Sequence, residues 1–331
     1  MRYVIYGAGG IGGVMAAKLH MHGIEVAVIA RGAHLQAIQK DGLRLRYPVA
    51  EEPVALPIPA YGNPSEIEFR DDDVVIMTMK SQDTFAALND LSNAAGDRVP
   101  VVNCQNGVEN ERMTLRLFSR VYGMVIFMPG AHLEPGLVET SAWPVTGVLD
   151  LGRYPSGNDL LAEAIAADLR SADFLSEARP DIMRLKYTKL LQNMLNAVQA
   201  VCGLKDADDL VAKLRREAEA CYRAAGINWA PNSAIDDRAA GLSRNRVHGW
   251  PGGSTLQSLL RGAGSVEVDY LNGEIVMLGR LHGVPTPGNE VFQAFANRMA
   301  RQRLAPGSYS VEEMRRHVAE REAAVVPGSA K

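Results

Sequence analysis

The sequence predicts an α/β chain in two parts, an N-terminal domain built on a doubly wound, mostly parallel sheet and an all-helical C-terminal domain. Three observations predict this fold class. Strand-like and helix-like segments alternate through the first half of the chain, a glycine-rich turn follows the first strand, and only helical patterns remain after Pro180. Alternating strands and helices form a parallel sheet with helices on both faces. We expect residues 1–177 to form the first domain and residues 178–331 the second.

The N-terminal domain is expected to contain strands that are apolar along almost their whole length, as is typical of strands buried on both faces. They are expected at Arg2–Tyr6, Glu25–Ala30, Asp73–Thr78, Pro100–Asn103 and Arg120–Phe127. The helices between them are expected at Ile11–His22, Ala33–Lys40, Thr84–Ala94 and Asn110–Phe118. Short β-like segments then predict an antiparallel extension of the same sheet, at Leu137–Thr140 and Pro144–Leu149. The last expected elements are a helix and a short apolar stretch, at Asp159–Ser171 and Ala172–Leu175.

The C-terminal domain is expected to be all helical. Its helices are expected at Asp181–Cys202, Ala207–Ala225, Asn232–Arg244, Ser254–Arg261, Val266–His282, Asn289–Leu304 and Ser310–Ala324. The last of these carries a narrow apolar stripe of Val311, Met314 and Val318, which docks either on its own chain or on a second subunit of a homodimer. The residues after Ala324 are expected to form a loose tail.

Composition excludes several classes of function. The 331 residues are enough for two domains, and the net charge of −3 gives no electrostatic support for nucleic-acid binding. The cysteines Cys104, Cys202 and Cys221 are widely spaced, and the histidines show no ligand spacing, so we expect neither disulfides nor a metal. The chain opens on a strand and contains no apolar run of the ~20 residues that span a bilayer. A cytoplasmic protein with no membrane partner is therefore expected.

A glycine-rich turn follows the first strand and reads Gly7-Ala8-Gly9-Gly10-Ile11-Gly12. In a GxGxxG turn the first glycine permits a tight exit from the strand, the second lets the backbone approach a pyrophosphate, and the third lets the helix pack closely on the sheet. Free N–H groups at the start of the next helix favour the charge of the phosphates. Such turns also serve packing alone, but here a strand, a helix and a second strand surround the turn. These six residues therefore predict a Rossmann-type dinucleotide site.

The end of the second strand indicates which dinucleotide binds. NAD sites usually place an Asp or Glu there, about 20 residues further on, to bind the ribose 2′-hydroxyl. This chain has Ala30-Arg31-Gly32 instead. A guanidinium can pair with a 2′-phosphate through two parallel hydrogen bonds, which predicts NADPH/NADP+ as the cofactor. The alternative is that Arg31 is a solvated surface residue.

The expected helix Asp181–Cys202 carries a polar stripe on an otherwise apolar surface. The stripe residues are spaced three, four and three apart and are Lys186, Lys189, Asn193 and Asn196. This spacing places them on one face of the helix. The stripe either lines a polar cleft or is an ordinary solvent face. Asparagine is mildly unfavourable in the middle of a helix, and on a solvent face lysine or glutamate is more usual.

Polar residues also follow two of the expected strands. Lys80 comes after Asp73–Thr78, and Asn106-Gly107 comes after Pro100–Asn103. Ligands of parallel sheets bind at this carboxyl edge. These residues therefore either contact a cofactor or are a solvated lysine and a simple turn.

The helical domain has two further polar positions of interest. Ser254 follows Gly252-Gly253 and either caps a helix or joins the free N–H groups behind it in holding a carboxylate. Glu267 and Asp269 lie in the first turn of the helix that is expected after Ser265 as its N-cap. Carboxylates are favoured electrostatically at this end of a helix, which is the alternative to a chemical role.

With these residues together, the chain resembles the ketopantoate reductases (2-dehydropantoate 2-reductases) over nearly its full length and in both domains. The resemblance rests on the order and spacing of short motifs: GAGGIGG with Arg31 downstream, Lys80, Asn106-Gly107, the KLLQN stretch with Lys189 and Asn193, and Ser254 thirteen residues before Glu267.

The resemblance implies NADPH-dependent reduction of a 2-oxo acid to a 2-hydroxy acid, in this family ketopantoate to pantoate in pantothenate biosynthesis. It implies that Lys189 donates a proton to the substrate oxygen and that Glu267 works with Lys189. It implies substrate contacts from Asn106, Asn193 and Ser254, with Asn196 on the same side. It also implies that Lys80 and Asn106 lie beside the cofactor.

Two positions depart from the family pattern. The family commonly has a second asparagine eight residues after the lysine, where this chain has Ala197 with Asn196 one place earlier. It often has an asparagine three residues before the serine, where this chain has Pro251. Both positions belong to the substrate side, so the identity of the acid stays open, and Trp250 can add an apolar wall there.

Two other classes of function also stay open. One is a related dehydrogenase that acts on a different 2-oxo acid or joins an amine to an oxo acid. Such enzymes more often rely on a His–Asp relay, and His248 is the single histidine near the expected substrate loop. The other is a non-enzymatic NADP sensor, which needs no proton donor such as Lys189.

Overall fold

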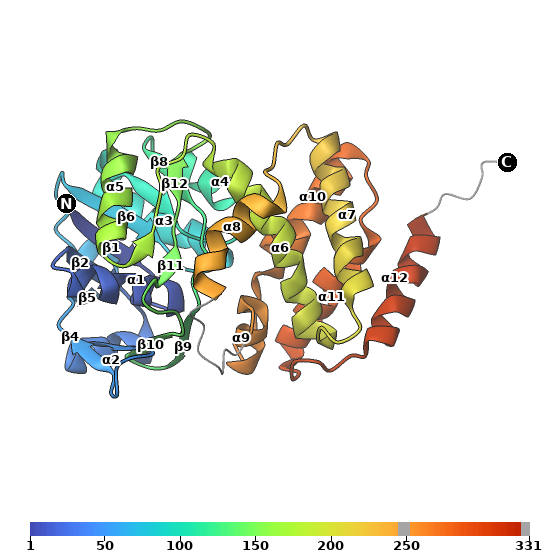
Figure 1. Ribbon diagram of the computed structural model, residues 1–331, viewed down its shortest axis with the longest axis horizontal. Coiled ribbons are helices and arrows are strands. Elements are labelled where there is room, and N and C mark those ends of the chain that lie inside the picture. Colours follow the sequence, from blue (N-terminus) through green and yellow to red (C-terminus); the bar gives the residue numbers. More distant parts are fainter. Residues whose placement is uncertain (244–251, 326–331) are drawn as a thin grey trace. The chain divides into compact units, whose positions relative to one another are not determined.

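The computed structural model describes residues 1–243 and 252–325 (Figure 1). Within this part of the chain, one compact unit is formed by residues 1–186 and 230–243, and a second by residues 187–229 and 252–325. The predicted boundary between residues 177 and 178 stays a prediction. The predicted fold class, an α/β part with a mostly parallel sheet followed by an all-helical part, is confirmed.

The main sheet of the first unit has seven strands in the order β12-β8-β7-β6-β1-β2-β5 (Figure 1). They are β1 (Arg2–Tyr6), β2 (Glu25–Ile29), β5 (Ala60–Tyr61), β6 (Asp73–Met77), β7 (Val101–Asn103), β8 (Val121–Met124) and β12 (Leu151–Arg153). All neighbours are parallel except β12 and β8. Strand β1 pairs with β2 on one side and β6 on the other, so the direction of winding reverses there. Ligands of such sheets bind beyond the carboxyl ends of the strands at this point.

The helices of the first unit follow the predicted alternation with the strands. They are α1 (Gly10–Met21), α2 (Gly32–Asp41), α3 (Ser81–Ala95), α4 (Asn110–Leu115), α5 (Leu160–Ser171) and α8 (Asn232–Ser243), with short 3-10 turns η1 (Pro64–Glu66) and η2 (Gly96–Arg98). The apolar core of the unit includes the fully buried Tyr3, Ile5 and Met15. Burial of this apolar surface is the main force that holds the helices on the sheet.

A second sheet corrects one of the sequence-based expectations. Strand β10 (Leu137–Thr140) does not extend the main sheet but lies in a four-stranded sheet in the order β4-β3-β10-β9. Its partners are β9 (Gly130–Glu134) and β3 (Leu43–Arg46), with β4 (Val54–Leu56) beyond β3. The expectation failed because β3 and β4 were not recognised. They supply an edge with which β10 pairs, while β12 occupies the edge of the main sheet beside β8.

The expected strand Pro144–Leu149 is also shorter and pairs elsewhere. Strand β11 (Gly147–Val148) pairs in parallel with β13 (Phe174–Leu175) in a separate two-stranded ribbon. Helix α8, from the far end of the first unit's sequence, contacts β11. Leu242 of α8 packs with Ala142 and Val148 in a small apolar cluster.

The second unit consists of helices. It contains α6 (Ile182–Cys202) from residue 187 on, together with α7 (Asp208–Ala224), α9 (Ser254–Leu260), α10 (Asn272–His282), α11 (Pro287–Gln302) and α12 (Val311–Val325). The helix expected at Val266–His282 is two elements, because the turn η3 (Glu267–Tyr270) and α10 are separated at Leu271. Each element is held on α11 by its own side chain: Asp269 accepts from Gln293 at 2.8 Å, and Asn272 donates to Asn289 at 3.0 Å.

The last helix docks on its own unit. Met314 and Val318 of α12 are buried, and His317 lies 4.9 Å from Phe295 of α11 between ring centroids. Of the two alternatives for this apolar stripe, docking on its own chain is therefore the one observed. The tail expected after Ala324 falls mostly on residues 326–331, outside the described part of the chain.

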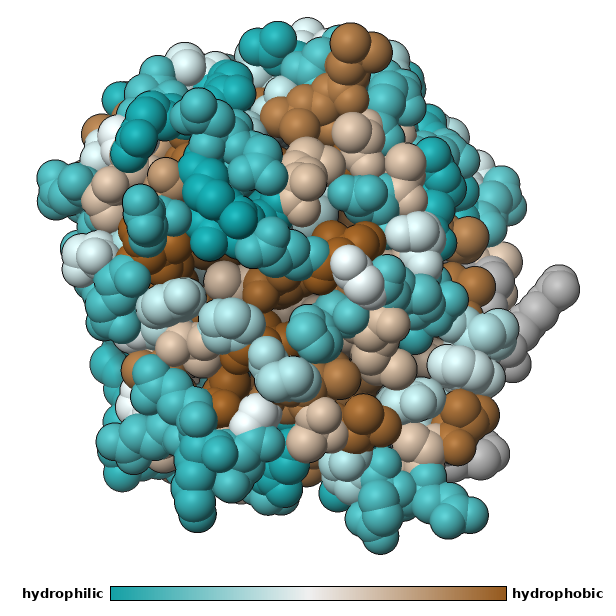
Figure 2. Space-filling model, turned by 90° about the vertical axis from the view of Figure 1, so that its left-hand side faces the viewer, coloured by the Kyte–Doolittle hydropathy of each residue, from teal (hydrophilic) through white to brown (hydrophobic). Residues whose placement is uncertain are grey.

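The described residues also bear on membranes and metals. No helix among residues 1–243 and 252–325 is long and apolar enough to cross a bilayer. Within the same residues, no group of three or more His, Cys, Asp or Glu side chains is placed to hold a metal ion. On the face shown in Figure 2, apolar side chains lie among hydrophilic ones and extend through the middle of the face to its upper edge. Such mixing is the ordinary composition of a protein surface.

Candidate active site

The glycine-rich loop between β1 and α1 has a separate geometric reason for each of its three motif glycines. Gly7 has φ +111°, which side chains rarely allow. A Cβ at Gly12, the third residue of α1, would lie 2.3 Å from the carbonyl oxygen of Gly7, so no larger residue fits there without a shift of the backbone. A Cβ at Gly9 would meet no atom within 4 Å. Packing therefore explains Gly7 and Gly12 but leaves Gly9 open, which fits a backbone that a ligand approaches.

The glycine-rich loop is held by side chains from two other segments. The Thr78 hydroxyl, at the end of β6, donates to the carbonyl oxygen of Gly7 at 2.6 Å. His34 Nε2 lies 2.6 Å from the carbonyl oxygen of Ala8, and the N–H of Gly136 donates to His34 Nδ1 at 2.8 Å. Because Nδ1 accepts, the imidazole is neutral and donates from Nε2 to Ala8. His34 therefore ties the loop to the turn between β9 and β10.

The environment of His34 keeps it neutral. Burial, and then the neighbouring ring of His132, lower the pKa of His34 to about 4, although its bond to Ala8 acts in the opposite direction. The two rings lie 4.0 Å apart between centroids. Sequence reasoning missed His34, because neither its position in α2 nor its spacing from Ala8 and Gly136 signals the contact.

Arg31 and Lys80 lie just beyond the carboxyl ends of β2 and β6, the two strands that flank β1 in the main sheet. Arg31 immediately precedes α2 and is 76% exposed, with its guanidinium 3.1 Å from the Asp83 carboxylate. Lys80 immediately precedes α3. The backbone N of Met79 would lie only 2.8 Å from a Cβ at Gly7, so the segment before Lys80 runs directly beside the glycine-rich loop. Both cations are thus at the edge of the sheet where a dinucleotide is expected.

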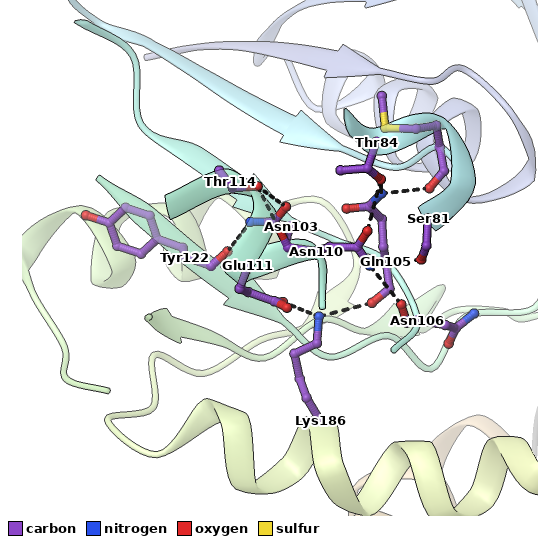
Figure 3. Close-up of polar contacts among 11 residues, drawn as sticks. Ser81, Thr84, Asn103, Gln105, Asn106, Asn110, Glu111, Thr114, Tyr122 and Lys186 are labelled. Atoms are coloured by element: carbon purple, nitrogen blue, oxygen red, sulfur yellow. Dashed lines mark hydrogen bonds and ion pairs between the residues drawn. The ribbon is translucent and has the colours of Figure 1, made fainter. Parts of the chain in front are cut away.

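A buried polar network holds the turn that carries Asn106 (Figure 3). Asn110, the first residue of α4, donates to the Asn106 carbonyl at 3.1 Å and to the Ser81 hydroxyl at 3.0 Å. The Gln105 amide donates to Thr84 at 2.7 Å and to the backbone of Met79 at 3.0 Å. The turns after β6 and β7 are therefore joined by side chains. The Asn106 side chain itself points away from this network (Figure 3).

Lys186 completes the network from α6. Its ammonium forms an ion pair with Glu111 of α4 and donates to the Gln105 carbonyl at 3.1 Å (Figure 3). The Lys186 side chain is 2% exposed and that of Glu111 is 0% exposed. Burial raises the pKa of Glu111, and the Lys186 ammonium opposes this shift. Sequence reasoning placed Lys186 on the polar stripe but did not find its partner.

The stripe on α6 is not an ordinary solvent face. Lys186 and Asn193 are buried, and Lys189 and Asn196 are half-buried. Asn196 lies beside the turn that precedes α9, since a Cβ at Gly253 would be 2.7 Å from its Oδ1. Of the two alternatives for this stripe, the solvent face is therefore wrong.

Ser254 lies at the start of α9, next to the polar stripe of α6. Gln199 of α6 accepts from the N–H of Gly253 at 2.8 Å. The N-cap is Gly253 and not Ser254, so the capping interpretation of Ser254 is wrong. The Ser254 hydroxyl is buried and has no hydrogen-bond partner among the described residues. A buried hydroxyl in this state is unusual in folded proteins.

Glu267 is the first residue of η3 and is 5% exposed. The residue that precedes η3 is Val266, which makes no side-chain capping bond, so the expectation of Ser265 as N-cap is wrong. A carboxylate this buried is uncommon for an ordinary charge at a helix start. The predicted substrate-side residues of the helical part, including Glu267, all belong to the second unit, whereas Asn106 and the cofactor-side residues belong to the first.

Of the two substrate-side positions that depart from the family pattern, Ala197 lies within the described residues and Pro251 does not. Ala197 is buried on α6, whereas the neighbouring Asn196 faces the glycine turn before α9. Pro251, Trp250 and His248 lie outside the described residues.

The first unit has a glycine-rich loop at the point where the winding of its parallel sheet reverses, and the second unit is helical and carries buried polar residues. Together these features define the class of two-part dinucleotide-binding α/β proteins. Two family models match the chain, "Ketopantoate reductase PanE/ApbA" over residues 3–155 and "Ketopantoate reductase PanE/ApbA C terminal" over residues 181–300. The chain belongs to the PanE/ApbA ketopantoate reductase family.

Relatives of known name cover the chain almost completely. A protein of Mesorhizobium japonicum named 2-dehydropantoate 2-reductase is 31% identical over 94% of this chain and 100% of its own length. A protein of Pyrococcus horikoshii with the same name is 29% identical over 93% of this chain and 100% of its own length.

Solved structures share the fold. A PanE/ApbA family ketopantoate reductase from Ralstonia eutropha has a TM-score of 0.77 at 27% identity, over 92% of this chain and 99% of its own. D-mandelate dehydrogenase, solved with NADH and anilino(oxo)acetate, has a TM-score of 0.79 at 22% identity, over 92% of this chain and 99% of its own. The second likeness concerns the fold alone, and NADH is a ligand of that protein.

Proposed function

We propose that this protein catalyses the NADPH-dependent reduction of ketopantoate to pantoate. The observation that carries the proposal is the full-length match to proteins named 2-dehydropantoate 2-reductase, which extends through both family regions. The three free cysteines suit a reducing compartment, so a cytoplasmic location is part of the same proposal.

The first unit supplies a fitting cradle for the cofactor. The open position at Gly9 and the N-terminus of the twelve-residue helix α1 suit a pyrophosphate. Arg31 would pair with the 2′-phosphate of NADPH, with Lys80 beyond the carboxyl end of β6, on the other side of β1. The exposed Arg31–Asp83 pair is weak in water, so a phosphate dianion can replace the carboxylate. When bound, the nicotinamide supplies the hydride for the reduction.

The substrate side is assigned to the polar residues of α6, α9 and η3. Lys189 would donate a proton to the oxygen of the reduced carbonyl, and Glu267 would hold the lysine charged and oriented. Asn193 and Asn196 would orient the acid through neutral hydrogen bonds, and a bond of the same kind is proposed for Asn106. The Ser254 hydroxyl, buried and without a hydrogen-bond partner among residues 1–243 and 252–325, supports a role in holding the substrate carboxylate.

The proposal is tested by following NADPH oxidation with purified protein, ketopantoate and a small panel of other 2-oxo acids. Efficient turnover of ketopantoate is expected. Turnover of another acid alone would indicate the second candidate, a dehydrogenase of altered specificity, which is suggested by Ala197 standing where the family commonly has an asparagine. Binding of NADPH without turnover of any acid would contradict the proposal and favour a sensor.

The cofactor is tested by comparing the dissociation constants of NADPH and NADH. Arg31→Ala should weaken NADPH binding about tenfold, since a hydrogen bond to a charged group contributes roughly 1.5 kcal/mol or more. NADH binding should not change. Asp83→Asn is the matched control: it removes the competing carboxylate and should tighten NADPH binding. Equal losses for both dinucleotides in Arg31→Ala would contradict a role at the 2′-phosphate.

A further inference from the structure

Among the described residues of the first unit, the Lys186–Glu111 pair is the most deeply buried ion pair, and it carries no role in the proposed reaction. Both side chains are almost completely removed from water, on α6 and α4. Taking two charges out of water costs free energy that their attraction often does not recover, so apolar residues of similar size are often as stable. Stability alone therefore does not account for this pair.

The pair acts on the turn that carries Asn106. The Lys186 ammonium binds Glu111 and, at the same time, the carbonyl of Gln105, the residue directly before Asn106. The Gln105 side chain is bound on its other side to Thr84 and to the backbone of Met79. In Figure 3 the Lys186 ammonium lies between Glu111 and the Gln105 carbonyl. Removing Lys186 would release the Gln105 carbonyl, while the Gln105 side chain and the Asn106 carbonyl stay bound.

The same lysine lies three residues before Lys189 on a continuous helix. Residues three apart lie on neighbouring parts of one helix face. The contact from Lys186 to the Gln105 carbonyl thus joins the turn bearing Asn106 to the first turns of α6. A small displacement of reacting groups is costly, because a shift of about 1 Å can reduce a rate about 100-fold.

We propose that Lys186 and Glu111 are positioning residues, which fix the Gln105–Asn106 turn against the start of α6 and thereby set the geometry for reduction of the 2-oxo acid. This inference rests on the proposed function. Both side chains are buried and bonded to protein atoms, so we infer that the pair acts through Asn106 and through the helix that carries Lys189. Neither residue contacts the glycine-rich loop in the bonds described above, so we expect the Kd for NADPH to change much less than kcat/KM.

The test compares Lys186→Met, Glu111→Leu and the double variant with the full-length wild type. Each single change leaves one charge buried without its partner and should lower the Tm strongly. The double variant replaces the pair by apolar side chains and should regain most of the Tm. If the pair positions the turn, kcat/KM of the double variant stays reduced about 100-fold while the Kd for NADPH remains within about twofold of wild type. Recovery of kcat/KM together with Tm would overturn the inference.

A double variant that fails to fold is replaced by Glu111→Gln, which preserves shape and removes one charge. A reduced kcat/KM with unchanged NADPH affinity is again expected, and an unchanged kcat/KM overturns the inference. A wild type without turnover of any 2-oxo acid contradicts the proposed function separately. Amide hydrogen exchange of residues 103–108 then decides the positioning role: faster exchange in the variant supports it, and equal exchange overturns it.

Discussion

Two turns at the carboxyl edge of the main sheet are built in opposite ways. The glycine-rich loop after β1 is shaped by the absence of side chains, since Gly7 needs a positive φ and Gly12 has no room for a Cβ. The turn after β7 is shaped by buried side chains, with Gln105 and Asn110 bonded in several directions and Lys186 bound behind them. The first construction leaves open space for a ligand beside the backbone, and the second aims one side chain, that of Asn106.

This difference in construction predicts that substitutions in the two turns impair different properties of the enzyme. Changes in the glycine-rich loop should act on cofactor binding, because the loop presents backbone to the dinucleotide. Changes on the polar side should act on turnover, because side chains there orient groups and transfer protons.

The largest effect is expected for Lys189→Ala, on the polar side. Loss of a proton donor should lower kcat about 10²- to 10⁴-fold. The Kd for NADPH should change little, because the glycine-rich loop is intact. Steady-state kinetics and a fluorescence titration of NADPH measure the two quantities. The matched control is Lys205→Ala, which removes an exposed lysine of the same unit and should have no effect. A kcat close to wild type would show that Lys189 is not the donor.

A smaller effect, on NADPH binding, is expected for Gly9→Ala. This variant separates the two reasons for glycine in the loop, which are approach of a ligand at Gly9 and packing at Gly12. Because a Cβ at Gly9 meets nothing within 4 Å, the Tm should remain unchanged. NADPH binding should weaken, by about tenfold or more if the methyl group costs the ~1.4 kcal/mol that corresponds to a factor of ten. Gly12→Ala is the comparison, since its Cβ would lie 2.3 Å from the Gly7 carbonyl oxygen and should lower the unfolding free energy by about 1–3 kcal/mol. If Gly9→Ala binds NADPH normally, the cofactor does not approach at Gly9.

The smallest effect is expected from pH, through His34 beneath the glycine-rich loop. The pKa of His34 is about 4 in the folded protein and ordinarily about 6.5, so between these values the unfolded chain binds a proton that the folded protein does not. Stability should therefore fall as pH decreases from about 6.5 to about 4, with no further loss from this residue below that range. Urea unfolding of His34→Gln should show a shallower dependence on pH than that of wild type. Equal slopes would mean that His34 titrates normally.

Much of the first unit was predictable from the sequence, because buried strands and glycine turns leave local signals. Strand β1 and the start of α4 were predicted at their observed residues. The second sheet was not, since β3 (LRLR) and β9 (GAHLE) contain charged residues and, like β4, depend on pairing across the chain. The single helix expected over Val266–His282 failed because Asp269 and Asn272 bond separately to α11, which periodicity does not reveal.

The polar residues of the candidate site were predictable as a set, but their surroundings were not. The spacing of Lys186, Lys189 and Asn193 placed them on one helix face, and burial then decided between a cleft and a solvent face. The partners of Lys186 and His34 lie 75 and 26 residues away in the chain, and no local pattern links them. Contacts of this kind follow from tertiary packing, which a single sequence does not encode in any short window.

The path of the chain through its two units limits how the protein can be divided. The first unit is made of two segments of the chain: the first runs to residue 186 and the second starts at residue 230 and contains α8. Ile235 of α8 packs with Val125 and Ile182, while Leu242 fills a second apolar cluster. A gene fragment that stops after residue 186 would leave these apolar surfaces bare and prone to aggregation. A chimeric reductase that takes one unit from a relative should therefore keep α8 with the nucleotide-binding first unit. This holds although α8 comes after α6 and α7 in the sequence.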